Sequence, residues 1–174
     1  MFTVKKTLAA TRNLQAIGAV TLELYCKQKN VECSILSDLI RHLKNVLVQR
    51  SLSTWEQECI KLEGCCRGDF LPKQVSMLID NPVTRMQLER LINCVVEIGM
   101  VDMYGASTDE PRKAVEFAIT IARQNGLALN SLQRVLLNCH GDAHPLQDWG
   151  ETVTSEDAEK LVVCYKQNLL GQCE

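Results

Sequence analysis

Residues 88–137 read LERLINCVVEIGMVDMYGASTDEPRKAVEFAITIARQNGLALNSLQRVLL, and this stretch decides the fold. Apolar residues in its first part recur at spacings of three and four, which is the periodicity of a helix with one buried face. An alanine-rich stripe starting at Ala114 repeats the pattern, and a shorter one follows from Leu132. Consecutive helices with short loops pack as antiparallel neighbours, so the stretch predicts three packed helices of an all-α protein.

The turns between these helices contain residues that end and begin helices. Gly105 can adopt the positive φ angle that closes a helix. Thr108 or Asp109 is expected to cap the second helix, and Asn130 is expected to start the third. Pro111 is tolerated in a first helical turn, because the amide hydrogen that it lacks has no helical partner there.

Three features of this stretch occur together in a known family. An apolar-Asp-x-x-Gly turn at Asp102 is followed by Thr-Asp-Glu-Pro at 108–111 and by AITIARQNGL, which fits A-[ILV]-x-x-A-R-x-x-G-L. This combination resembles the core of TerB-like domains, a family that includes the tellurite-resistance protein TerB and the N-terminal region of some membrane-linked co-chaperones. The resemblance implies a helical core over about 84–140 and an acidic, metal-binding cluster, here Asp102, Asp109 and Glu110.

The acidic turn admits two interpretations. Carboxylate oxygens on a loop suit hard cations such as calcium or magnesium, which take six or more oxygen ligands or retain waters. Acidic residues beside a helix N-terminus also act as caps and interact favourably with its positive end. Asp102, Asp109 and Glu110 are therefore expected to form either a weak divalent-cation site or a helix cap, and a divalent cation is the one cofactor that we expect.

Length and composition indicate one globular domain over 1–174. The chain has 46 % hydrophobic and 23 % charged residues, and its net charge is −2, so no basic excess argues for nucleic acid as a partner. No apolar run approaches the roughly 18 residues of a membrane span. The N-terminus lacks the apolar run of a signal peptide, and we predict a soluble, cytoplasmic protein.

Helical periodicity outside the central stretch predicts four or five more helices, giving a single-domain bundle of seven to eight antiparallel helices with short loops. The first is expected over about 6–29, with Arg12 and Gln15 on its outer face. Ser53 and Glu56 form a capping box that is expected to start a third helix at Thr54. Further expected helices lie near Ser34 or Ser37, over 72–80, and from Thr154 or Ser155 to Gly171. Asn81-Pro82 is expected to start the first helix of the central stretch.

Nine cysteines without a secretion signal are expected to be mostly reduced thiols. Four of them lie within helical patterns and are interpreted as small buried hydrophobes; these are Cys26, Cys59, Cys94 and Cys164. Cys65 and Cys66 lie in the expected loop 64–72 beside Arg67, where exposed thiols can be reactive.

A second candidate metal site follows the central stretch. Cys139, His140, Asp142 and His144 supply thiolate, imidazole and carboxylate groups, all of which bind zinc. The alternative interpretation is an ordinary loop made by glycine, aspartate and proline, with Cys139 belonging to the core.

No nucleophile is placed beside a base and no glycine loop is built to cradle phosphate, so we predict a non-enzymatic protein. The leading hypothesis is a helical binding domain similar to TerB, which binds a divalent cation weakly or a protein partner. The alternative is a small inhibitor or adaptor of the bacterial immunity-protein type. A third hypothesis, a thiol- or zinc-dependent enzyme using the 139–144 loop, predicts bound zinc. The oligomeric state stays open.

Overall fold

The computed structural model describes residues 10–105, 108–140 and 149–172. Within these ranges it contains eight α-helices, one short 3-10 helix and no strand, which confirms the predicted all-α bundle. The elements in chain order are α1 (Thr11–Gln28), α2 (Ser34–Asn45), α3 (Leu52–Lys61), η1 (Glu63–Cys65), α4 (Lys73–Ser76), α5 (Pro82–Ile98), α6 (Glu110–Gln124), α7 (Leu132–His140) and α8 (Ser155–Leu170).

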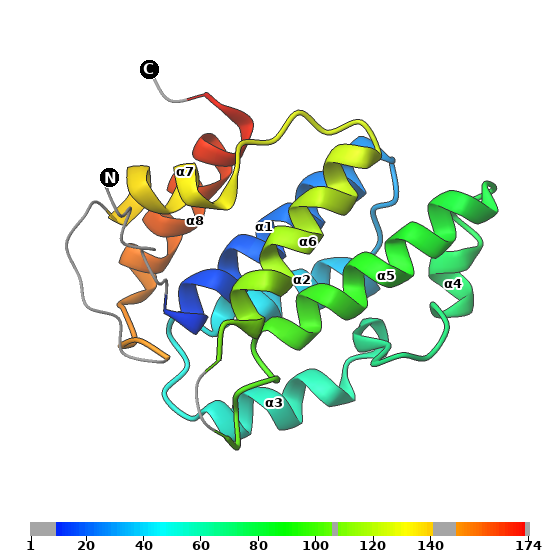
Figure 1. The fold of residues 1–174 in the computed structure, drawn as a ribbon. Helices are drawn as coiled ribbons and strands as arrows, with labels where there is room; N and C mark the ends of the chain where they lie inside the picture. The colour runs from blue at the N-terminus through cyan, green and yellow to red at the C-terminus, as the bar shows by residue number, and fades with distance from the viewer. Residues whose placement is uncertain (1–9, 106–107, 141–148, 173–174) are drawn as a thin grey trace.

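Helix α1 lies at the centre of the bundle. Helices α2, α5, α6 and α8 all pack against it (Figure 1), and 14 of its 18 residues are buried. Small side chains allow these neighbours to approach closely. Gly18 lies so near α5 that an added Cβ would overlap Ile98.

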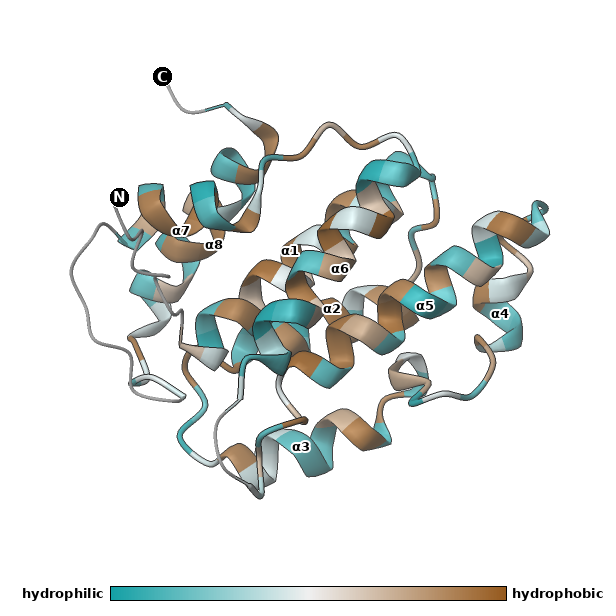
Figure 2. Ribbon diagram, in the orientation of Figure 1, coloured by the Kyte–Doolittle hydropathy of each residue, from teal (hydrophilic) through white to brown (hydrophobic). Residues whose placement is uncertain are grey.

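Several predicted helix boundaries are confirmed. The Asn81 side chain accepts hydrogen bonds from the backbone amides of Val83 and Thr84, at 2.8 and 3.3 Å, at the start of α5. Thr154 caps α8, and Gly171 ends it with a φ of 69°. Each long helix carries both apolar and polar residues along its length, as its periodicity predicts (Figure 2).

Two helix starts and one helix length differ from the prediction. Ser51, not Ser53, caps α3, because its hydroxyl accepts a hydrogen bond from the Thr54 amide at 3.2 Å. Helix α1 begins at Thr11 in the described residues, and 1–9 lie outside them. Helix α4 is a single turn, much shorter than 72–80.

The third helix of the central stretch packs differently from the prediction. Helices α5 and α6 are close neighbours, but α7 packs chiefly against α8 and only slightly against α6. Asn130, just before α7, explains this: its amide and side-chain nitrogens donate to the carbonyls of Leu169 and Asn168, each at 2.7 Å. These bonds join the chain before α7 to the end of α8.

The prediction that Arg12 and Gln15 face outward is wrong. Arg12 is 5 % exposed, and its guanidinium donates to the carbonyls of Val46, of Gln49 at 2.8 Å and of Gly150 at 3.3 Å. Carbonyls at and beyond a helix C-terminus lack helical partners, and Arg12 supplies donors to those that follow α2. Gln15 is fully buried and donates to the Val95 carbonyl at 2.9 Å.

In the part of the chain that the structure describes, no helix has both the length and the apolar character needed to cross a membrane.

Replacing Arg12 with alanine should lower the free energy of unfolding by about 3 kcal/mol, because it leaves buried carbonyls without donors. Urea unfolding followed by circular dichroism measures this. The matched control is Arg41→Ala, which removes an exposed guanidinium paired with Asp38 and should change the midpoint little. Equal effects of the two substitutions would show that the Arg12 contacts do not support the fold.

Candidate functional site

A cavity of about 880 Å³ forms a groove lined by residues of α2 and α8. Both helices pack against α1. The apolar lining of the groove comes from the segment after α2, the end of α3 and one face of α8, and comprises Val48, Leu62, Ala158, Val162 and Val163.

Charged residues at the rim of this groove already have partners. Arg41 pairs with Asp38 at 2.6 Å, and Lys44 pairs with Glu23 at 2.8 Å. His42 is half-buried; its ring stacks on Trp55 with centroids 5.6 Å apart, and its Nε2 donates to the Trp55 carbonyl at 2.8 Å. The groove therefore offers an apolar floor and no excess of positive charge for an anion.

The acidic turn between α5 and α6 is held together by Asp102. Asp102 is 6 % exposed; its two carboxylate oxygens accept hydrogen bonds from the Thr108 amide and hydroxyl, each at 2.8 Å. The Thr108 hydroxyl also accepts from the Glu110 amide at 3.1 Å. In this network the Asp102 carboxylate braces the turn, and the Thr108 hydroxyl binds the amide of Glu110, the first residue of α6.

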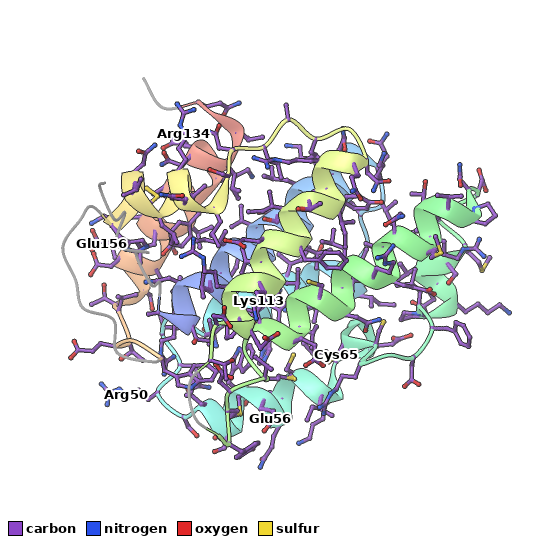
Figure 3. All side chains as sticks on the ribbon, in the orientation of Figure 1. Arg50, Glu56, Cys65, Lys113, Arg134 and Glu156 are labelled. Atoms are coloured by element: carbon purple, nitrogen blue, oxygen red, sulfur yellow. A yellow bond between two sulfur atoms is a disulfide. The ribbon has the colours of Figure 1, made fainter. Side chains whose placement is uncertain are left out.

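The other two acidic residues of this turn interact with a lysine one turn along α6. Lys113 (Figure 3) lies 3.0 Å from the Asp109 carboxylate and 2.8 Å from that of Glu110. Hydrogen bonds to these two carboxylates raise the pKa of Lys113. Asp109 and Glu110 therefore interact with Lys113 in the structure, whereas Asp102 binds Thr108.

The described residues include no group of three or more histidine, cysteine, aspartate or glutamate side chains that could hold a metal ion. The structure does not bring Asp102, Asp109 and Glu110 together in that way. Of these three, only Asp102 is buried, and its bonds to Thr108 are those of a helix-capping turn. Asp102 therefore braces the turn, whereas Asp109 occupies the N-cap position of α6 without a side-chain cap hydrogen bond and Glu110 lies in the first turn.

The candidate zinc residues are divided between described and undescribed parts of the chain. His140 ends α7, and its Nε2 lies 2.9 Å from the Tyr165 hydroxyl. Asp142 and His144 lie outside the described residues. Cys139 forms a disulfide with Cys164 of α8, their Cα atoms being 6.2 Å apart, so its sulfur is not a free thiolate in this state.

This disulfide corrects the expectation that Cys164 is a buried thiol. Helical spacing in the sequence assigns Cys139 and Cys164 each to a helix. It does not predict that these two helices lie beside each other. The Asn168 side chain lies against both sulfur atoms, at 3.3 Å from Cys139 and 3.4 Å from Cys164. Six of the cysteines within the described ranges are free thiols; the predicted Cys26 and Cys59 are buried, whereas the predicted Cys94 is only half-buried.

Two other cysteines face each other near α3. The sulfur atoms of Cys59, in α3, and Cys65, in η1, are 3.9 Å apart, and both residues are buried. Cys65 lies where α3, η1 and α5 meet (Figure 3). The sequence indicated reactive, exposed thiols in this loop, but Cys65 is 2 % exposed.

Exposed apolar side chains gather around α4 and the first turns of α5. We call Phe70, Met77, Leu78, Val83 and Met86 the arm surface. Phe70 is 91 % exposed and Met77 is 73 % exposed. This region projects beyond α1 and α2 at one end of the molecule (Figure 1).

The arm surface is not predicted from the sequence, although two signals for it are present. Phe70 follows the turn-forming residues Arg67-Gly-Asp and belongs to no helical apolar repeat. The apolar run after Pro72 predicts one helix, but only a single turn forms. That turn buries Val75 and leaves Met77 and Leu78 exposed.

Asp102→Asn should lower the free energy of unfolding by about 1–2 kcal/mol, because an amide cannot accept both bonds from Thr108. Thermal unfolding should show the same loss with and without added calcium or magnesium. The control Asp109→Asn, on an exposed residue, should have a much smaller effect. A rise in wild-type Tm with either cation that is absent from Asp102→Asn would instead support the cation site.

Reduction of Cys139–Cys164, which are 25 residues apart, should lower the free energy of unfolding by about 3 kcal/mol, because the open chain gains entropy when unfolded. Urea unfolding with and without a phosphine reductant measures the difference. Cys139→Ser with Cys164→Ser should match the reduced wild type and no longer respond to reductant. An unchanged midpoint on reduction would contradict this account.

Comparisons with protein-family models, with curated proteins and with solved structures find no match to this chain. The resemblance to TerB-like domains therefore stays a prediction.

Proposed function

We propose that this chain is a non-catalytic helical binding protein and that a protein partner docks on the arm surface. The observation that supports this most is the exposure of five large apolar side chains within one short segment, 70–86. Large apolar patches on soluble proteins commonly mark interaction sites. The proposal corresponds to the inhibitor or adaptor alternative more closely than to a cation-binding protein.

The side chains of the arm surface suit an adaptable protein contact. Methionine is flexible and polarizable, so surfaces that contain it accommodate partners of different shape; this surface includes Met77 and Met86. Burying one such side chain contributes roughly 1.5–3 kcal/mol before the costs of association. Phe70, at 91 % exposure, has the most area to lose.

Positive and negative charges near the arm surface almost balance, and this indicates which kind of side chain the partner contributes to the contact. Segment 70–90 has three basic and two acidic residues. Three of these five are engaged: Arg85 donates to the Ile79 carbonyl, Glu89 accepts from the Leu71 amide, and Arg90 lies over the Phe117 ring. The proposed partner is therefore a protein surface of aliphatic and aromatic side chains, and binding should be nearly insensitive to salt.

The groove between α2 and α8 is a weaker candidate for this contact. Of its five apolar lining residues only Val163 is exposed, at 53 %, and the other four are half-buried. The groove nevertheless provides a matched comparison, because it also has an apolar lining and lies on different helices from the arm surface.

Phe70→Ser with Met77→Ser should abolish binding of the partner, whereas Val48→Ser with Val163→Ser, in the groove, should leave binding unchanged. The chain is used to purify complexes from cells that express it natively, and the bound protein is quantified by mass spectrometry. A photoreactive methionine at Met77 or Met86 should cross-link to that same protein. The partner should be recovered at constant stoichiometry and should stay bound in 0.5 M salt, where the Debye length is about 4 Å and charge interactions are largely screened.

Three outcomes would contradict the proposal. One is loss of the partner from the groove variant with retention by the arm variant. Another is a cross-link map without arm residues. The third is self-association of purified wild-type chain that the arm substitutions abolish, which would make a second copy of the chain the occupant of the arm surface.

A further inference from the structure

The cysteine pair in α3 and η1 has no part in the proposed binding function, yet its geometry is that of a reactive site. The Cys59 and Cys65 sulfur atoms are 3.9 Å apart, about 2 Å more than a disulfide bond requires. They are separated by six positions in the chain, so the backbone between them is short. Forming the bond requires the two sulfur atoms to move about 2 Å closer together.

The backbone directly after Cys65 is held in an unfavourable conformation. Cys66 has φ 53° and ψ −40°, and the Arg67 amide donates to the Cys65 carbonyl at 2.6 Å. This is the rare γ-turn with positive φ. Arg67 and Gly68 also have positive φ, at 33° and 91°. Non-glycine residues avoid this region, so the backbone at Cys66 and Arg67 is strained. Because Cys65 is 2 % exposed, access of an oxidant to its sulfur requires this turn to open.

The surroundings also make the two thiols unequal. The hydrogen bond from Cys59 and the nearby Arg67 guanidinium lower the pKa of Cys65. The same hydrogen bond and burial raise the pKa of Cys59. Burial raises the pKa of the adjacent Cys66 to about 11. Cys65 is therefore the thiol that most readily becomes the nucleophilic thiolate.

We propose that Cys59 and Cys65 form a redox-active dithiol, which a peroxide converts to an intramolecular disulfide. Cys65 is the attacking residue and Cys59 is the resolving residue. This assignment does not depend on the proposed binding function.

The reaction proceeds in two steps. The Cys65 thiolate attacks one oxygen of hydrogen peroxide; an S–O bond forms, the O–O bond breaks, and the hydroxide that leaves takes a proton from solvent to become water. The Cys59 sulfur then attacks the Cys65 sulfenic acid. The S–S bond forms, the S–O bond breaks, and the departing hydroxide takes the Cys59 proton as water. Two thiols lose two electrons, and the peroxide is reduced to two waters.

Tryptic mapping of the wild-type chain tests this without any substitution. The folded chain is treated with hydrogen peroxide, its free thiols are alkylated, and the digest is analysed without reduction. Cleavage after Lys61 and Arg67 places Cys59 in peptide 51–61 and both Cys65 and Cys66 in peptide 62–67. The expected product is 51–61 linked to 62–67, with the mass of two hydrogens lost, and a reductant should reverse it. Cys26 and Cys94, whose pKa values burial raises to about 12 and about 11, should stay alkylatable.

Three variants assign the roles. Cys66→Ser should still give the linked peptides, which excludes Cys66 as the partner. Cys59→Ser should leave a sulfenic acid on Cys65 that dimedone labels. Cys65→Ser should prevent both the link and the label. Circular dichroism verifies that each variant is folded. Peptides that remain unlinked in oxidised wild type, or a link that Cys66→Ser abolishes, would overturn the assignment.

Discussion

The burial of α1 among four other helices is the constraint on which the rest of the structure depends. Polar side chains in the buried part of a helix need hydrogen-bond partners inside the protein. Arg12 and the Gln15 amide nitrogen donate to carbonyls of other segments, and Thr21 donates to the Ile17 carbonyl of its own helix. Polar side chains of α1 thus connect it to the segment after α2 and to α5. Gly99, at the end of α5, completes this packing: an added Cβ would lie 2.6 Å from both Gln15 and Trp55.

The features that sequence predicted well are those determined within a few residues. The all-α class, the cap at Asn81 and the stop at Gly171 depend on local periodicity and local hydrogen bonds. The position of Arg12 was mispredicted because helical periodicity treats a charged residue as exposed. Nothing near Arg12 in the sequence reveals that carbonyls after α2 lack donors.

The same distinction between local and long-range contacts applies to the candidate sites. Asp102 and Thr108 are six residues apart, so the turn that they form could be predicted from the sequence. The hydrogen bonds between them could not. The cysteine pairs depend on how helices are arranged. Cys139 meets Cys164 because α7 packs on α8 rather than on α6. Cys59 meets Cys65 because the chain reverses from α3 into η1. Phe70 could not be assigned to a surface until the length of α4 was known.

The Cys139–Cys164 disulfide also changes the topology of the molecule. Together with the backbone between them it closes a covalent ring that contains both the end of α7 and most of the first three turns of α8. A single cut in the peptide chain inside this ring opens the ring without separating the two fragments. The nicked molecule keeps its full mass until the sulfur bridge is reduced, so α8 stays attached to the chain that precedes it even when the connecting backbone is broken.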